Sequence, residues 1–192
     1  MGLKLEAEDR PGADMVRTQV HREPRRWLPH GTLVIEPLAA HPEVLPVLRQ
    51  WFEMEWPSYY GAGGPGDAER DLDAFAQRGS LPVGVVAFLD GSVCGVAALK
   101  SESIPSHRHL SPWASAGLVQ PLHRSKGIGL QLLSALEQEA RNLGFNCIYC
   151  ATGTAESLLQ RCGWQLIEHI DHDGQNLGLY RKALQPNFSE RR

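Results

Sequence analysis

The stretch Val119-Gln-Pro-Leu-His-Arg124-Ser-Lys-Gly127-Ile-Gly129-Leu130 organises the rest of the chain. A mostly apolar run, residues 114–119, leads into it, and residues 130–143 show helical periodicity. The pattern predicts a strand, then a positively charged glycine turn, then a helix. Glycine lets the backbone approach a ligand, and the first N–H groups of a helix lack partners within it. The start of this helix therefore suits a phosphate or pyrophosphate group.

The turn differs from two common phosphate-binding motifs. No Gly-Lys-Ser or Gly-Lys-Thr closes it as in a Walker loop, and the G-x-G-x-x-G spacing of dinucleotide-binding turns is absent. It resembles the acetyl-CoA loop of the GCN5-related N-acetyltransferases, Arg/Gln-x-x-Gly-x-Gly/Ala after a Val-x-Pro strand end. Val119-Gln-Pro121 and Arg124-Ser-Lys-Gly127-Ile-Gly129 match it in order and spacing. The alternative is an ordinary strand-to-helix turn with solvated Arg and Lys side chains.

A second segment resembles the other signature of the same family, Asn-x-x-Ala-x-x-x-Tyr-x-x-x-Gly-Phe/Trp. It reads Thr152-Gly-Thr-Ala155-Glu-Ser-Leu-Leu159-Gln-Arg-Cys-Gly163-Trp164. Thr152 stands where Asn is usual, and Leu159 stands where Tyr is usual. Two motifs in this order, with a helix and a strand between them, are far more specific than either motif alone.

The remaining patterns predict one α+β domain. Its expected form is a GNAT-like mixed central sheet of about six to seven strands, flanked by about four helices. The resemblance implies the same element order over residues 32–184. The predicted strands are residues 32–36, 82–89, 92–100, 113–119, 147–151, 164–170 and 177–182, and the predicted helices are residues 42–56, 67–77, 130–143 and 154–161.

Several local features carry their own expectations. Pro46 has to fall in the first turn of helix 42–56, whose apolar face includes Met54. Asp67 caps the start of the next helix and Gly79 its end. Asp90-Gly91 predicts a hairpin turn, and residues 171–176 connect the last two strands. The aromatic and glycine-rich residues 56–66 form a loop that either lines a substrate mouth or folds into the edge of the core.

Composition and charge limit the possible classes of protein. The chain has 192 residues, of which 42% are hydrophobic and 21% charged, with a formal net charge of −3. We divide it into a polar arm (1–30), an acetyltransferase domain (31–184) and a tail (185–192). The charge gives no case for nucleic-acid binding, and no apolar run suits a membrane span. Four cysteines without an export signal favour reduced thiols and a cytoplasmic location.

The pair Cys147 and Cys150 forms a C-x-x-C, the spacing of half a zinc site or a redox pair. It lies in a predicted strand, where residues three apart point to opposite faces. We therefore interpret both as ordinary strand thiols and expect no metal.

The resemblance implies an enzyme that transfers an acetyl group from acetyl-CoA, as co-substrate, to a primary amine of a small molecule, and a homodimer is possible. The strand end would splay and offer backbone groups to the pantetheine, and the turn would hold the pyrophosphate by backbone N–H groups. The residues expected to bind the cofactor are Leu118, Val119, Arg124, Ser125, Lys126, Gly127, Ile128, Gly129, Leu130, Thr152 and Ser157.

The sequence offers several alternatives for the catalytic acid and base. The family's Tyr would protonate the leaving thiolate, whereas Leu159 offers only an apolar side chain near the expected sulfur position. The thiolate leaves without an acid, or Tyr149, Ser157 or water supplies the proton. Candidate bases are Glu102 and His109, then His107, with Glu168, His169 and His172 behind them. A non-catalytic acyl-CoA sensor and, more remotely, a phosphate-loop nucleotide binder remain as alternatives.

Overall fold

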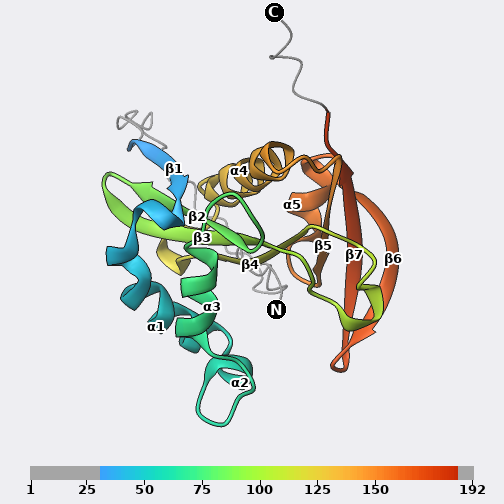
Figure 1. The fold of residues 1–192 in the computed structure, drawn as a ribbon, viewed down its shortest axis with the longest axis horizontal. Coiled ribbons are helices and arrows are strands. Elements are labelled where there is room, and N and C mark those ends of the chain that lie inside the picture. The colour runs from blue at the N-terminus through green and yellow to red at the C-terminus, as the bar shows by residue number, and fades with distance from the viewer. Residues whose placement is uncertain (1–30, 186–192) are drawn as a thin grey trace, which may run out of the picture.

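A seven-stranded mixed sheet forms the centre of the protein (Figure 1). The computed structural model describes residues 31–185, so the predicted arm and most of the predicted tail lie outside the described residues. The strand order is β1-β2-β3-β4-β5-β7-β6, with β4 and β5 parallel and the other neighbours antiparallel. The strands are β1 Leu33–Pro37, β2 Val83–Leu89, β3 Ser92–Lys100, β4 Trp113–Val119, β5 Cys147–Thr152, β6 Gln165–His172 and β7 Gln175–Ala183.

Helices cover both faces of this sheet. One face carries α1 and α3, and the opposite face carries α4, with α5 beside β5 (Figure 1). The α+β prediction is confirmed, but α2 is a single turn inside the predicted loop 56–66, which corrects that part of the prediction. The helices are α1 Leu45–Glu55, α2 Pro57–Tyr60, α3 Ala68–Phe75, α4 Ile128–Asn142 and α5 Glu156–Arg161, with 3-10 turns at Leu38–Ala40, Pro42–Val44, Pro105–His107 and Pro121–His123.

The core has a cluster on each face of the sheet, because successive strand residues point to opposite faces. Val85 packs in the cluster that contains Leu132 and Leu136 of α4. Its neighbour Val86 packs in the cluster that contains Phe52 of α1 and Phe75 of α3. Strands β2, β3 and β4 are therefore apolar on both faces, which explains their almost continuous Val and Ala runs.

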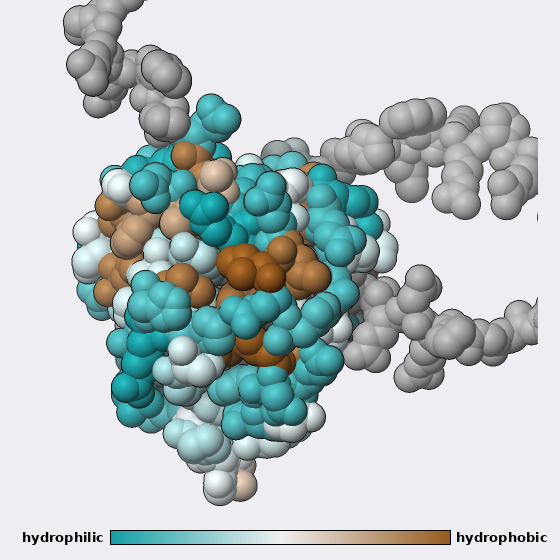
Figure 2. Space-filling view, turned by 90° about the vertical axis from the view of Figure 1, so that its right-hand side faces the viewer, coloured by the Kyte–Doolittle hydropathy of each residue, from teal (hydrophilic) through white to brown (hydrophobic). Residues whose placement is uncertain are grey.

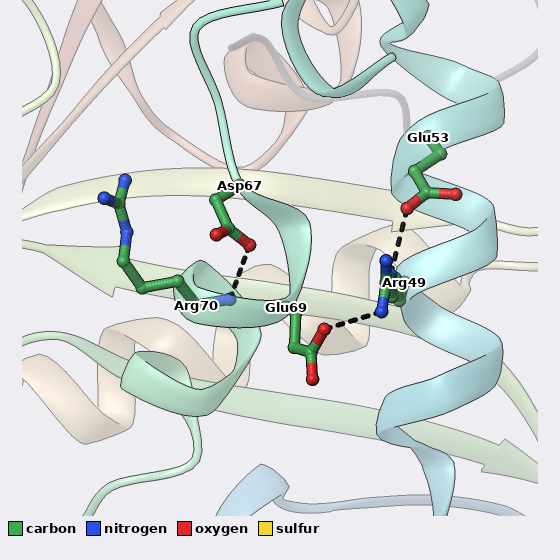
Figure 3. A network of polar contacts seen from close by, with 5 residues as sticks. All are labelled: Arg49, Glu53, Asp67, Glu69 and Arg70. Atoms are coloured by element: carbon green, nitrogen blue, oxygen red, sulfur yellow. Dashed lines mark hydrogen bonds and ion pairs between the residues drawn. The ribbon is translucent and has the colours of Figure 1, made fainter. Parts of the chain in front are cut away.

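An ion pair joins α1 to α3, and a second lies within α1 (Figure 3). Arg49 lies between Glu53 of its own helix, with Nε to Oε1 at 3.0 Å, and Glu69 of α3, with Nη1 to Oε2 at 2.6 Å. The predicted Asp67 cap is confirmed, because its side chain accepts a hydrogen bond from the Arg70 N–H at 3.0 Å. Pro46 lies in the first turn of α1, as its missing N–H requires.

Two predictions about these helices are wrong. Helix α3 ends at Phe75 with Ala76 as its C-cap, so Gly79, although at φ 77°, lies too far along the chain to end it. Met54, predicted on the apolar face of α1, is 70% exposed. The helix turns Met54 away from the core because Trp51 and Phe52 already occupy its buried face.

Strand β4 bends in its middle and leaves its parallel neighbour. Ala116 has φ 51°, and the register between β3 and β4 shifts between Val96 and Ala98. In the described sheet, β4 and β5 share one register pair, Trp113 with Tyr149. The two strands therefore diverge towards Val119 and Thr152, which confirms the splay that the resemblance implies.

Both antiparallel hairpins turn on an Asp-Gly dipeptide. Asp90 and Gly91 have φ 52° and 77°, as a type I′ turn requires, which confirms the first hairpin. The second turn is Asp173-Gly174, with φ 52° and 72°. The predicted connection over residues 171–176 is therefore too long, since the two-residue turn lets both strands extend to its edge.

Strands β1 and β6 form the two edges of the sheet, and β6 lies on the side that Figure 2 presents. Apolar surface gathers near the centre of this face, and Leu166 and Ile167 of β6 are 44% and 47% exposed. The homodimer stays a prediction. Within residues 31–185, no helix combines the length and the apolar character that a membrane span needs.

Candidate active site

The turn before α4 presents free backbone donors. Helix α4 begins at Ile128, two residues earlier than predicted, and its N-cap is Gly127 in the left-handed region at φ 79°. No side chain caps the helix, so its first N–H groups have no side-chain partner among the described residues. Ser125, Lys126 and Gly127 are exposed, and Ser125 also has a left-handed φ of 60°. This geometry fits the predicted pyrophosphate position, to which the Lys126 ammonium adds positive charge.

Arg124 lies inside this arrangement and not in solvent. Its Nε donates a hydrogen bond to the Val119 carbonyl at 2.9 Å, and its Nη2 lies 3.1 Å from Glu55 Oε2. The Arg124 side chain is only 16% exposed and that of Glu55 21%. One guanidinium thus joins the turn, the end of β4 and the end of α1. The alternative of a merely solvated Arg124 is wrong, whereas its contact with a pyrophosphate stays a prediction.

The ends of β4 and β5 are buried. Leu118 and Val119 have almost no exposed surface, and the Val119 carbonyl accepts the hydrogen bond from Arg124 Nε, so their contact with a cofactor stays a prediction. Thr152 is fully buried, and its Oγ1 accepts hydrogen bonds from the N–H groups of Thr154 and Ala155, each at 3.1 Å. It thereby holds the loop that leads into α5. Ser157, on the first turn of α5, is exposed.

Leu159 belongs to the core. Its side chain has no exposed surface and packs in the cluster with Ala155, Leu158 and Trp164. It lies outside the lining of the cavity described below, and its position beside the cofactor sulfur stays a prediction. Gly163, at φ 79°, ends α5 and lets Trp164 turn back over Leu159, whose carbonyl accepts the Trp164 N–H at 3.0 Å.

A cavity of about 780 Å³ lies between the end of α1 and the β6–β7 turn. Residues 55–59, at the end of α1 and in α2, form one wall. The other wall consists of the loop after β5 and the β6–β7 hairpin, namely Gly153, Thr154, His172, Asp173, Gln175, Asn176 and Leu177. Its size suits a small-molecule ligand. Glu55 belongs both to this wall and to the ion pair with Arg124, so the cavity adjoins the glycine turn.

Some aromatic residues of the predicted loop 56–66 line the cavity, and another folds into the edge of the core. Trp56 and Tyr59 line the cavity. Tyr60 instead enters the core edge, where its hydroxyl donates a hydrogen bond to Asp71 Oδ2 at 2.9 Å. Burial, together with the Asp71 carboxylate, raises the pKa of Tyr60, so its hydroxyl stays protonated at physiological pH.

The predicted bases lie on the loop between β3 and β4, outside the lining of this cavity. Glu102 is exposed and lies 3.5 Å from Arg108, and His109 is exposed beside the His107 ring. His107 Nε2 lies 3.2 Å from Glu168 Oε1, which ties the loop to β6. His172, one of the three more remote predicted candidates, does line the cavity, and its Nε2 lies 3.6 Å from Asp173 Oδ2.

The cysteines agree with their interpretation as strand thiols. Cys150 is fully buried, and burial raises the pKa of its thiol well above the ordinary range. Cys147, on the other face of β5, donates a weak hydrogen bond to the Tyr149 hydroxyl at 3.4 Å. None of the four forms a disulfide, and residues 31–185 contain no group of three or more His, Cys, Asp or Glu side chains that could hold a metal ion.

Sequence reasoning missed Glu55 and Ser115. Glu55 looks like an ordinary polar residue at a helix end, and its partner Arg124 is 69 positions away in the sequence. Ser115 Oγ is buried in β4 and is the one such side-chain atom in the described part of the chain without a hydrogen-bond partner. Its only sequence signal is a hydroxyl in an apolar strand.

Comparisons with known proteins agree with this geometry. Residues 48–164, well over half of the chain, match the model of the Acetyltransferase (GNAT) family. The chain therefore belongs to this family, as its two motifs predict. A search of curated proteins gave no match.

Solved structures share the fold. An aminoglycoside 6'-N-acetyltransferase complexed with coenzyme A has a TM-score of 0.65 at 14% identity, over 80% of this chain and 98% of that one. The Salmonella typhimurium protein yncA, solved with its cofactor acetyl-CoA, gives 0.62 at 20% identity, over 82% and 96%. An N-acetyltransferase from Staphylococcus aureus gives 0.63 at 19% identity, over 80% and 99%. At these identities the likeness establishes the fold alone.

Proposed function

We propose that the protein is an N-acetyltransferase that moves the acetyl group of acetyl-CoA to a primary amine of a small molecule. The observation that carries this proposal is the Arg124–Glu55 ion pair at 3.1 Å. It places the wall of a ligand-sized cavity directly beside the end of β4 and the glycine turn. Two binding regions meet there, as a reaction between two substrates requires.

The residues of the glycine turn and of the neighbouring strand ends fit the cofactor. The N–H groups at the start of α4 suit a pyrophosphate, and exposed Lys126 adds charge. Residues 124–130 would hold it, with the backbone of Leu118 and Val119 beside the pantetheine and with Thr152 and Ser157 on the β5 side. Acetyl-CoA supplies the acetyl group as an activated thioester. Structures of family relatives with coenzyme A and with acetyl-CoA support the assignment.

The amine has to lose a proton before it can attack the thioester. We propose His172 as the group that accepts it, because histidine suits proton transfer near neutral pH and His172 lines the cavity. Glu102 and His109 remain candidates from the sequence. On the leaving side Leu159 offers no proton, but a thiol with a pKa of about 8.5 leaves without strong assistance.

The missing acid also favours a second candidate function, a non-catalytic acyl-CoA sensor of the same fold. Two measurements separate the possibilities. First, acetyl-CoA should raise the melting temperature far more than ATP does, and equal protection by ATP would point to a nucleotide site. Second, a panel of small amines should release free thiol from acetyl-CoA. Strong acetyl-CoA binding with no thiol release from any amine would replace the enzyme by the sensor.

Proton transfer can be located by substitution. His172→Gln should lower kcat and change the low-pH limb of the rate profile, while acetyl-CoA affinity stays within about twofold. Glu102→Gln and His109→Gln are measured in parallel. The variant whose rate profile loses its low-pH limb identifies the base. An unchanged low-pH limb in His172→Gln would contradict our assignment.

A further inference from the structure

The acceptor cavity has an unbalanced set of charged side chains. Its walls include the carboxylates of Glu55 and Asp173 and the imidazole of His172. No Lys or Arg side chain belongs to the part of its wall that the described residues form. The Arg124 guanidinium lies against Glu55 but outside the lining, so the charged groups that face the cavity itself favour a cation over an anion. Trp56 and Tyr59 also line the cavity, and aromatic rings attract cations.

The two carboxylates are not equivalent. Asp173 is 89% exposed at the tip of the β6–β7 turn, where solvent screens its charge. The Glu55 side chain is 21% exposed at the end of α1. A charge partly removed from water interacts more strongly with a partner, so Glu55 is the stronger cation-binding group.

Glu55 is also held in one orientation. Its Oε2 accepts a hydrogen bond from Arg124 Nη2 at 3.1 Å, and Arg124 is itself fixed by the bond from its Nε to the Val119 carbonyl at 2.9 Å. Within residues 31–185, Oε1 accepts no hydrogen bond. A carboxylate has about four acceptor positions, so the pair leaves Glu55 able to bind a second donor.

We infer that Glu55 binds a positively charged group of the acceptor, with Arg124 positioning its carboxylate, and that the acceptor is consequently an amine with a second cationic group. This inference rests on the proposed function, because it assigns the acceptor to this cavity. An amine that attacks a thioester has to be neutral. The cation at Glu55 is therefore a second ammonium group. Amines that carry a carboxylate where this second ammonium group would lie are disfavoured as acceptors.

The test compares 1,5-diaminopentane with pentylamine, which differ by one terminal ammonium group. Thiol release gives kcat and KM for each amine. The wild type should prefer the diamine by about tenfold or more in kcat/KM, the size of one charged hydrogen bond. Glu55→Gln should reduce this preference to about twofold or less, mainly through KM for the diamine.

The matched control is Glu53→Gln. Glu53 lies two residues earlier on α1, forms an ion pair with Arg49 and lies outside this cavity (Figure 3). This variant should keep the diamine preference. Arg124→Lys keeps the charge but not both bonds of the guanidinium, and should give an intermediate preference. No diamine preference in the wild type, or one that Glu55→Gln leaves intact, would overturn the inference.

A binding experiment separates this inference from the proposed function. Calorimetry measures 1,5-diaminopentane binding to the full chain saturated with free coenzyme A, where no chemistry occurs. Glu55→Gln should weaken this binding about tenfold and Glu53→Gln should not. Such a result without thiol release would retain the Glu55 site and refute the transferase. Thiol release with no difference in diamine binding between the variants would retain the transferase and refute the Glu55 site.

Discussion

Trp113 and Tyr149 form the one register pair between β4 and β5 in the described sheet, and their ring centroids lie 5.9 Å apart. Trp113 is fully buried, and its Nε1 donates a hydrogen bond to the Leu110 carbonyl at 2.6 Å. This anchor keeps the two halves of the sheet together at one end. Beyond it the facing backbone groups do not pair with each other, and such groups need other partners. A bound cofactor can supply those partners between the diverging strands.

The first prediction concerns Gly127. A side chain there meets no atom within 4 Å, but φ is 79°, which strains any L-residue by about 1–2 kcal/mol. Gly127→Val should weaken acetyl-CoA binding at least about tenfold by disturbing the backbone donors. Gly144→Val is the control, since Gly144, at the other end of α4, has φ 85° and equally open surroundings. Equal loss of affinity in both variants, measured by calorimetry, would contradict a role of Gly127 in binding.

Thr152 should contribute to stability through its hydroxyl. Thr152→Ala removes the acceptor for the Thr154 and Ala155 N–H groups and should cost about 1–2 kcal/mol in urea unfolding. Thr152→Asn keeps an acceptor at similar volume and should lose less than the Ala variant. If both variants unfold at the same urea concentration, the two hydrogen bonds are not what holds this loop.

Leu159 should act through packing and not through chemistry. Because the side chain has no exposed surface, Leu159→Ala should lower the free energy of unfolding by about 2–5 kcal/mol. Leu159→Tyr adds volume to a filled core and should cost about 1–3 kcal/mol without a gain in kcat. Stopped-flow acetyl transfer, measured where the variants remain folded, provides the check. A faster chemical step in Leu159→Tyr would show that a phenol at this position does reach the sulfur.

His41 should make stability depend on pH. Its Nδ1 lies 2.9 Å from Glu43 and its Nε2 2.6 Å from Glu36, and the hydrogen bond to Glu43 is the main cause that raises its pKa. A raised pKa stabilises the folded state below the unfolded value of about 6.5, and this contribution disappears as pH rises through the folded value. The stability difference between wild type and His41→Gln should therefore be largest below pH of about 6 and shrink in alkaline solution.

Urea unfolding across this pH range provides the measurement. His169→Gln, which removes an exposed histidine of β6 far from Glu36 and Glu43 in the sequence, is the control for the loss of an imidazole. A pH-independent effect of His41→Gln would show that the ring contributes by packing against Phe88, whose centroid lies 4.7 Å away.

The sequence alone determined the features that depend on neighbours in the chain. Asp90-Gly91 specifies its hairpin because both residues tolerate a positive φ, and Asp67 specifies the start of α3 through a bond only three residues long. The turn at Gly127 is local in the same sense. Its glycines and the following apolar periodicity predict the strand, the anion-binding turn and the helix without any distant contact.

Tertiary structure alone decided which distant residues meet, because such contacts depend on how the whole sheet packs. It put Arg124 beside Glu55 and so gave the cavity between α1 and the β6–β7 turn a fixed carboxylate. It also buried Leu159, since the residue after Gly163 folds back over it. No local pattern distinguishes a leucine that faces a ligand from one that faces the core. Burial depends on the elements that cover a residue, and those come from other parts of the chain.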